Sequence, residues 1–121
     1  MARDYNVQQG IKVFTKGRQK KCIYADNIRY IEKYGKTSII YLENPLNGSK
    51  DMEILDDETL KNFEEYLSQY GFIRIHGSIL INGLYVTEIG NDKSGKFVKL
   101  GEKRLDVSER KIKNLNEWAK Q

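Results

Sequence analysis

Short runs of mostly apolar residues dominate the chain, and they are rich in β-branched and aromatic side chains. The run IRYIEKY at 28–34, for example, is followed by the turn sequence YGK and then by TSIIYLE at 37–43. Runs of this length, bounded by turn residues, are typical of strands joined by tight turns. We therefore predict a mostly β fold of antiparallel sheets packed on one another. The other predicted strands are 11–15, 21–25, 51–55, 72–76, 78–82, 84–89, 97–100 and 104–107.

One stretch in the middle of the chain has helical periodicity instead. In the sequence DDETLKNFEEYLSQYG, Leu60, Phe63 and Leu67 are spaced to share one face of a helix. Acidic residues stand where this helix would begin, and Gly71 is suited to end it. The pattern predicts one amphipathic helix over about 57–70, packed on the sheets.

A second, short helix is predicted at the C-terminal end, in the sequence SERKIKNLNEWAKQ. Ser108 is suited to cap its N-terminus. Its expected buried stripe is Ile112, Leu115 and Ala119, with Trp118 beside the stripe.

The chain length predicts a single domain, because 121 residues can bury a core without a metal or disulfides. Residues 1–10 are expected to form a loose arm. The apolar runs are too short to span a bilayer and the opening residues lack a signal peptide, so we predict a cytoplasmic protein. Cys22 is the only cysteine, which excludes an intrachain disulfide, and we assign it to packing.

The net charge of +4 is modest for a nucleic-acid-binding protein, so the distribution of charge matters more. Basic residues cluster within 12–21 and again within 93–113, whereas acidic residues gather within 51–65. If the two basic segments meet in space, they would form a face for a polyanion. The alternative is that these lysines lie at solvated strand edges and hairpin tips, where lysine also blocks aggregation. Charge alone leaves both interpretations open.

The chain is poor in candidates for catalysis. Any nucleophile would depend on His76, the only histidine, and Ser78 is near enough in sequence to lie on the same face of a strand. The serine lacks the Gly-x-Ser-x-Gly context of a hydrolase, and the chain has no glycine-rich phosphate loop. The acidic cluster is better explained as a helix N-terminus than as a metal site. We therefore expect neither an enzyme nor a cofactor.

An anion-binding position is predicted at the start of the C-terminal helix. Arg110 and Lys111 stand in its first turn, where the helix dipole makes a cation unfavourable by about 0.3–1 kcal/mol. An anion docked there would be held by both cations, the Ser108 hydroxyl and free backbone N–H groups. The alternative is that both side chains extend into water, with Glu109 offsetting their charge.

The stretch FIRIHGSILING at 72–83 follows the predicted amphipathic helix and is followed by YVTEI. It resembles the signature of the LytTR family of bacterial DNA-binding domains: an aromatic residue, then Arg, His, Ser and Asn at this spacing. DNIRYIEKYGKTSIIYL is similar to the family's early strand pair, and LGEKRLDVSERKIKNL resembles its closing hairpin and final helix. The resemblance runs from about residue 11 to about residue 115, and we assign 11–121 to one LytTR-like domain.

The resemblance implies an elongated β fold whose loops and turns, not a recognition helix, enter successive major grooves and bend the DNA. Family members are bacterial transcription regulators, often joined to a receiver domain and often bound to paired direct repeats. A second copy on the DNA is therefore implied. Nothing in these 121 residues resembles a receiver domain, so we expect either a free-standing regulator or part of a longer one. A free-standing regulator would need another signal, such as a partner protein that sequesters it.

By position, the resemblance places DNA-reading residues at Lys36, Gly77 and Arg110. Arg110 could bind a guanine edge or a phosphate, and Lys36 would act as a flexible point charge. Local chemistry adds Ser78 and Ser108 as phosphate contacts. The predicted DNA-binding positions are Lys36, His76, Gly77, Ser78, Ser108, Arg110 and Lys111.

His76 is interpreted mainly as a structural residue. Its ring is expected to hydrogen-bond nearby backbone where the strand surfaces, with direct DNA contact as the lesser alternative. Asn82 is interpreted as a turn former.

The chain departs from the family pattern at two positions. Gly77 stands where the family usually has Arg, Asn or Lys, so only backbone can make a contact there. Glu109 stands where Arg is common, which puts a negative charge near the expected phosphate. Lys111, Lys113 and Arg104 are the cations that could compensate for it.

Two other functions remain as alternatives. One is a protein-interaction module that docks through the acidic helix or exposed tyrosines and does not bind DNA. The other is binding of single strands or RNA, with bases stacked on tyrosines, although tyrosines in strands more often pack across the sheet. The tyrosines concerned are Tyr5, Tyr24, Tyr30, Tyr34 and Tyr41.

Overall fold

The structure of the chain, a computed structural model, describes residues 10–14, 20–35, 37–43, 51–54 and 60–120. Short strands account for most of these residues, as the sequence pattern predicted. The strands are β1 (Gly10–Phe14), β2 (Lys20–Tyr24), β3 (Ile28–Tyr34), β4 (Thr37–Leu42), β5 (Asp51–Ile54), β6 (Phe72–His76), β7 (Ile79–Asn82), β8 (Glu88–Asp92), β9 (Gly95–Leu100) and β10 (Lys103–Asp106). The helices are α1 (Leu60–Leu67) and α2 (Ile112–Ala119), with short 3-10 turns η1 (Ala25–Asn27), η2 (Ser68–Tyr70), η3 (Gly83–Tyr85) and η4 (Glu109–Lys111).

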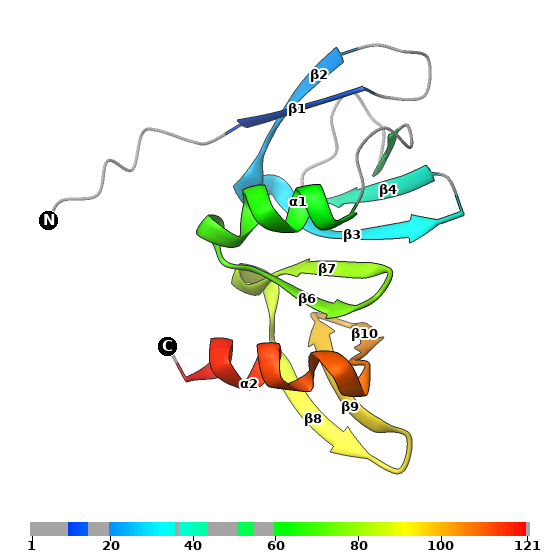
Figure 1. Cartoon of the computed structure of the whole chain (residues 1–121), viewed down its shortest axis with the longest axis vertical. Helices are drawn as coiled ribbons and strands as arrows, with labels where there is room; N and C mark the ends of the chain where they lie inside the picture. The colour runs from blue at the N-terminus through cyan, green and yellow to red at the C-terminus, as the bar shows by residue number, and fades with distance from the viewer. Residues whose placement is uncertain (1–9, 15–19, 36, 44–50, 55–59, 121) are drawn as a thin grey trace, which may run out of the picture.

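The strands form three antiparallel sheets that follow one another along the long axis of the molecule (Figure 1). The hairpin β1-β2 lies at one end, a five-stranded sheet in the order β5-β4-β3-β7-β6 lies in the middle, and the sheet β10-β9-β8 lies at the other end. The prediction of an elongated, mostly β fold of packed antiparallel sheets is confirmed. The predicted arm, residues 1–10, falls outside the described residues except for Gly10, which begins β1.

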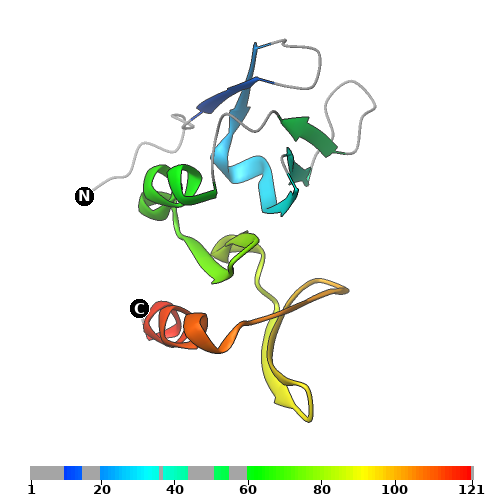
Figure 2. The same cartoon turned by 45° about the vertical axis from the view of Figure 1, so that its right-hand side comes forward.

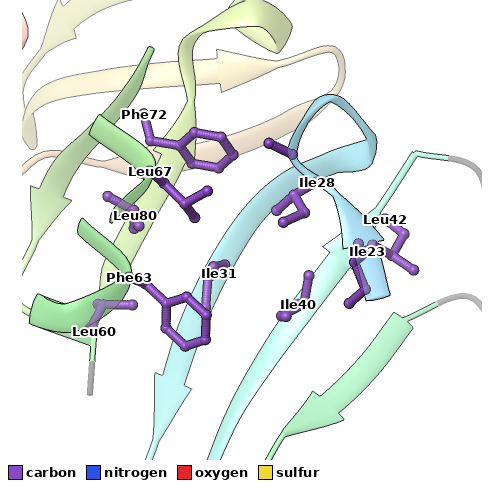
Figure 3. Packing of buried hydrophobic residues seen from close by; sticks show 11 residues of the cluster. Ile23, Ile28, Ile31, Ile40, Leu42, Leu60, Phe63, Leu67, Phe72 and Leu80 are labelled. Carbon is purple, nitrogen blue, oxygen red and sulfur yellow. The ribbon is translucent and has the colours of Figure 1, made fainter. Parts of the chain in front are cut away.

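The amphipathic helix covers one face of the five-stranded sheet and forms the first hydrophobic core (Figure 3). Leu60, Phe63 and Leu67 are all buried against the sheet, as their spacing predicted. Burying each such side chain stabilises the fold by about 1.5–3 kcal/mol. The chain continues through η2 and leaves the helix at Gly71, whose φ of 86° is the left-handed conformation that glycine adopts without strain. Residues 57–59 of the predicted helix lie outside the described residues.

The second hydrophobic core lies on the other face of the same sheet, where the three-stranded sheet and α2 pack against β6 and β7. Leu115 of α2 is fully buried in it, and Ile112 and Trp118 pack at its margin. The expected stripe was wrong at Ala119, which is exposed. Trp118 takes that place because its ring lies over Gly83, where a Cβ atom would come within 2.6 Å of it.

Two β-bulges decide which side chains face which core. In β3 the register shifts between Ile28 and Tyr30, so one extra residue is inserted opposite β4. The insertion lets Ile28 and Ile31, three positions apart, both face the first core, while Tyr30 faces the second. A second shift lies in β6 between Arg74 and His76, immediately before the chain turns into β7.

Asn82 is a buried polar residue with a structural role. Its side chain is 2% exposed and accepts a hydrogen bond from the backbone N–H of Leu84 at 2.9 Å, which begins η3. Its amide nitrogen donates to the carbonyls of Ile28 at 3.0 Å and Ala25 at 3.4 Å. The interpretation of Asn82 as a turn former is therefore confirmed, and the residue also joins β7 to the start of β3.

Candidate nucleic-acid interface

Three segments distant in sequence meet at the turn between β6 and β7. The backbone N–H of Ser108 donates to the carbonyl of Ile75 at 2.9 Å, which joins the segment before α2 to β6. The backbone N–H of Lys33, near the end of β3, donates to the carbonyl of Ser78 at 2.9 Å. The β3–β4 tip, the β6–β7 turn and η4 therefore lie together on one side of the molecule, opposite the C-terminal end of α2 (Figure 1). When that side is turned forward, the β6–β7 turn and the segment leading into α2 lie one above the other (Figure 2).

The β6–β7 turn is organised by the ring of His76. The backbone N–H of Ser78 donates to Nδ1 of His76 at 3.2 Å, and the Ser78 hydroxyl lies 3.1 Å from the same nitrogen. Because Nδ1 accepts the N–H, a neutral ring carries its proton on Nε2. The expected hydrogen bond from the His76 ring to nearby backbone is confirmed. The imidazole itself is exposed at the surface.

The Ser78–His76 contact is a turn contact rather than a prepared nucleophile. The same Nδ1 that would serve as the base already accepts the backbone N–H of Ser78. Within the part of the chain that the structure describes, no three His, Cys, Asp or Glu side chains are grouped to hold a metal ion.

Arg74 is a site residue that the sequence reasoning missed. Its guanidinium donates to the carbonyl of His76 at 2.9 Å and to the carbonyl of Gly77 at 2.6 Å, and it pairs with Glu64 of α1 at 3.0 Å. The signal in the sequence was an arginine between the apolar residues Ile73 and Ile75. Such a residue must find partners for its charge, because a buried unpaired cation is costly.

Gly77 lies at the exposed tip of the β6–β7 turn. A Cβ atom added there would meet nothing within 4 Å, and its backbone is not in the left-handed region that favours glycine. A larger residue therefore fits at this position without strain. The glycine that stands here in place of the family's Arg, Asn or Lys therefore leaves open space on the surface of the turn.

We expect Gly77→Lys to bind duplex DNA several-fold more tightly than the wild-type protein. The added ammonium would reach the DNA from an unstrained position, and one more phosphate contact steepens the slope of log K against log salt by about 0.9. Titrations of labelled duplex at several salt concentrations measure both quantities. Gly77→Ala adds the Cβ without a charge and should bind like the wild type. Equal slopes for the Lys and Ala variants would show that this turn does not approach phosphate.

The segment Ser108–Lys111 begins α2 differently from the prediction. Ser108 is the residue before η4, and its hydroxyl makes no capping hydrogen bond. The N–H of Lys111 instead donates to the carbonyl of Ser108 at 2.9 Å, which closes a 3-10 turn and delays α2 until Ile112. The prediction of a side-chain cap at Ser108 was wrong, because this tighter turn satisfies the N–H of Lys111 through backbone. The Ser108 hydroxyl is thus not committed to capping.

Arg110 is exposed, and among the described residues no side chain pairs with it. Lys111 beside it is half-buried, and Glu109 is exposed. The backbone of Arg110 therefore lies close to the β6–β7 turn, since Ser108 is bonded to β6, and its exposed guanidinium has no side-chain partner among the described residues. Such a group can bind a phosphate or the edge of a guanine.

Lys36 lies outside the described residues, but the strand ends beside it are described. Tyr34 is 51% exposed, and its hydroxyl donates to the carboxylate of Glu32 at 2.7 Å. This hydrogen bond to a carboxylate raises the pKa of Tyr34 above its ordinary range, so the hydroxyl stays a neutral donor. The Thr37 hydroxyl donates to the carbonyl of Tyr34 at 3.2 Å and supports the turn.

Tyr30 and Tyr41 are committed to packing. Their rings stack across β3 and β4 with centroids 4.2 Å apart, and Tyr30 is 3% exposed. These two tyrosines therefore pack across the strands and do not present their rings for base stacking. Tyr24 and Tyr34 are exposed, whereas Tyr5 lies outside the described residues.

Arg104 is bound within the three-stranded sheet. Its guanidinium pairs with Asp92 at 2.7 Å and with Asp106 at 3.4 Å, and it lies 4.1 Å from the centre of the Phe97 ring. A guanidinium held by two carboxylates and an aromatic face has little charge to offer another anion. Arg104 is therefore a poor compensator for Glu109. The side chains of the first basic segment, 12–21, lie outside what the structure describes, so its meeting with the second stays a prediction.

The Asp92–Arg104 pair should make stability depend on pH. The hydrogen bond from Arg104, followed by that from the Ser94 backbone, lowers the pKa of Asp92. A lowered pKa in the folded state stabilises the fold above the unfolded pKa, about 3.9, and this stabilisation is lost as the pH falls through the lowered value. We expect Asp92→Asn to melt below the wild type at neutral pH and to converge with it in acid. In an Arg104→Gln background, the melting-temperature difference between Asp92→Asn and Asp92 should change much less with pH. A difference between Asp92→Asn and the wild type that stays constant across the pH range would contradict the role of the Asp92–Arg104 pair.

The part of the chain that the structure describes contains no helix long and apolar enough to cross a membrane.

Comparisons with known proteins agree with this geometry. The family model of the LytTR DNA-binding domain matches residues 18–120. Among solved structures, one similar chain is described as the LytTR DNA-binding domain of a methyl-accepting/DNA response regulator from Bacillus cereus. It is 16% identical, the match covers 93% of this chain and 98% of that one, and the TM-score is 0.73, which supports the fold. No curated protein matches the chain. Because the family model spans nearly all of it, the chain belongs to the LytTR family, a family of DNA-binding domains and not of enzymes.

Proposed function

We propose that this chain recognises specific sequences in double-stranded DNA as a bacterial transcription regulator. The observation that carries the proposal is the meeting of the β6–β7 turn with the Ser108–Lys111 segment beside the end of β3. The β6–β7 turn and β3 belong to the five-stranded sheet, whereas the Ser108–Lys111 segment follows β10 of the three-stranded sheet, yet all three lie on one side of an elongated molecule (Figure 1). A row of turns suits the reading of successive major grooves, because each turn can reach a separate part of the duplex.

Each turn has its own chemistry toward DNA. Arg110 would supply an exposed guanidinium that no described side chain pairs with, and the Ser108 and Ser78 hydroxyls would supply phosphate contacts. His76 and Gly77 form the exposed tip between them, where contact from Gly77 comes from backbone alone. Lys111 adds positive charge next to Arg110, and Lys36 would add it at the β3–β4 tip.

Regulation by this chain would involve further partners. Direct repeats in a promoter would bring two copies onto one site, with association occurring on the DNA. A partner protein that sequesters the chain would supply a signal where no receiver domain is attached. Such a regulator would work in the cytoplasm, where the promoter DNA is.

The decisive experiment is selection of bound fragments from a bacterial genome, followed by titration of the selected duplex against salt. We expect a direct-repeat motif, and a linear loss of log affinity with log salt as counterions are released. Single strands of the same sequence should compete poorly. If no duplex binds even at low salt, the proposal is wrong and the protein-interaction alternative gains support.

A further inference from the structure

Arg74 occupies an unusual position for a charged residue. It lies in the edge strand β6 between the buried residues Ile73 and Ile75, and its side chain is only 14% exposed. A guanidinium this shielded needs partners, and it has three: the carboxylate of Glu64 and the carbonyls of His76 and Gly77. Hydrogen bonds from a charged donor are about twice as strong as neutral ones. Arg74 therefore forms strong bonds to the turn immediately after it in the chain.

The same side chain spans the β-bulge of β6. The register shifts between Arg74 and His76, and a bulge of this kind bends the strand and re-aims the residues on its C-terminal side. A bulge leaves an extra residue without a partner in the ladder, so the direction of the turn must be held by other bonds. Arg74 supplies them from before the bulge to two carbonyls after it.

The other end of this contact is fixed to α1. Glu64 pairs with Arg74 at 3.0 Å, and its neighbours Phe63 and Leu67 are buried in the first core. Helix α1 is therefore anchored in the first core, and Glu64 on α1 fixes the position of the Arg74 guanidinium. We call the set Glu64, Arg74 and the carbonyls of His76 and Gly77 the arginine clamp.

We propose that Arg74 is a positioning residue for DNA recognition, acting through the β6–β7 turn and not by touching DNA. The clamp holds the carbonyls of the turn while the His76 ring holds the Ser78 N–H, so the tip has one orientation before DNA arrives. A turn that already has its bound orientation pays no further ordering cost when it binds. We expect this gain in affinity at a specific site, where the turn must fit a particular base sequence, and not on random DNA. The inference rests on the proposed function for its DNA part, whereas the clamp itself is a property of the free protein.

The first test uses the free protein. Lys at position 74 keeps the charge but lacks the planar fork that reaches two carbonyls and a carboxylate at once. In Arg74→Lys we expect the amide of Ser78, which is bonded to the His76 ring, to exchange hydrogen about tenfold faster, while amides in β9 keep their rates. Glu64→Gln should give a smaller change in the same direction. Unchanged exchange at the turn in Arg74→Lys would overturn the clamp.

The second test uses DNA, and its readout is the ratio of affinities for the selected duplex and for random duplex. We expect this ratio to fall about tenfold in Arg74→Lys with the salt slope unchanged, because random DNA is held by exposed cations that the substitution leaves in place. Leu105→Val, a conservative change in the second core, supplies a control with some lost stability and an intact clamp, and its ratio should equal that of the wild type.

The outcomes separate the clamp from its role in DNA recognition. If Arg74→Lys loses affinity equally for the selected and the random duplex, Arg74 is merely structural and the positioning role is wrong. The same holds if the ratio of the two affinities also falls in Leu105→Val. If the wild-type protein binds no duplex, the proposed function fails, which the wild-type titration reveals independently of the exchange measurements.

Discussion

Replacing Arg110 with alanine should weaken binding to the selected duplex by about 1–3 kcal/mol, roughly 5- to 150-fold. The guanidinium is exposed, and no described side chain pairs with it, so it can contact the DNA. Folding should be unaffected, because the side chain packs against nothing in either core. Titration of labelled duplex together with a thermal melt checks both expectations.

The pattern of the loss identifies the part of the DNA that Arg110 touches. If it binds a guanine edge, Arg110→Ala should relax sequence preference at one position. If it binds phosphate, affinity should fall uniformly across sequences and the salt slope should decrease by about 1. Lys120→Ala is the matched control: it removes one exposed positive charge at the far end of α2, and it should bind as the wild type does. A similar loss in both variants would mean that only net charge matters.

Replacing Asn82 with alanine should lower the free energy of unfolding by about 3 kcal/mol, because three backbone groups lose their partner, two of them in buried hydrogen bonds. The N–H of Leu84 and the carbonyls of Ile28 and Ala25 all bond to this side chain, which is 2% exposed. For a chain of this size, that loss corresponds to a fall in melting temperature of about 12 °C. Urea titration and a thermal melt measure the two quantities.

Asn91 offers a matched control for Asn82. It also lies in a strand, β8, but its side chain is exposed. Asn91→Ala should therefore change the unfolding free energy by less than about 0.5 kcal/mol. A loss below about 1 kcal/mol in Asn82→Ala would show that water replaces the side chain at these backbone groups.

The local elements could be predicted from the sequence because they depend on residues close together in the chain. Leu60, Phe63 and Leu67 are buried as their spacing predicted, and Gly71 ends the helical segment as expected. The turn-forming role of Asn82 and the backbone bond of the His76 ring were also predicted correctly, since both involve residues two apart. The burial of Ala119 was predicted wrongly, because Trp118 packs over Gly83 instead. The side-chain cap at Ser108 was predicted wrongly, because a 3-10 turn satisfies the N–H of Lys111 through backbone.

The site was only partly predictable for the same reason. Arg110 and Gly77 were singled out by sequence, but the bond between Ser108 and Ile75 that brings their segments together joins residues 33 positions apart. Arg104 was expected to be an available cation, yet Asp92 of β8 binds it from across the sheet, and Asp106 binds it from its own strand. Which charges are neutralised depends on strand register, and register depends on how whole strands pair.

Periodicity, turn residues and the FIRIHGSILING stretch were enough to predict a β-rich LytTR domain with two helices. The way in which the β6–β7 turn is held became visible in the folded chain alone. Arg74 reaches across a β-bulge to the carbonyls of His76 and Gly77 and is tied to Glu64 on α1. His76 and Gly77 are only two and three residues from Arg74, but these bonds depend on the bulge, which forms only when β6 pairs with β7, and on Glu64, which α1 brings to Arg74.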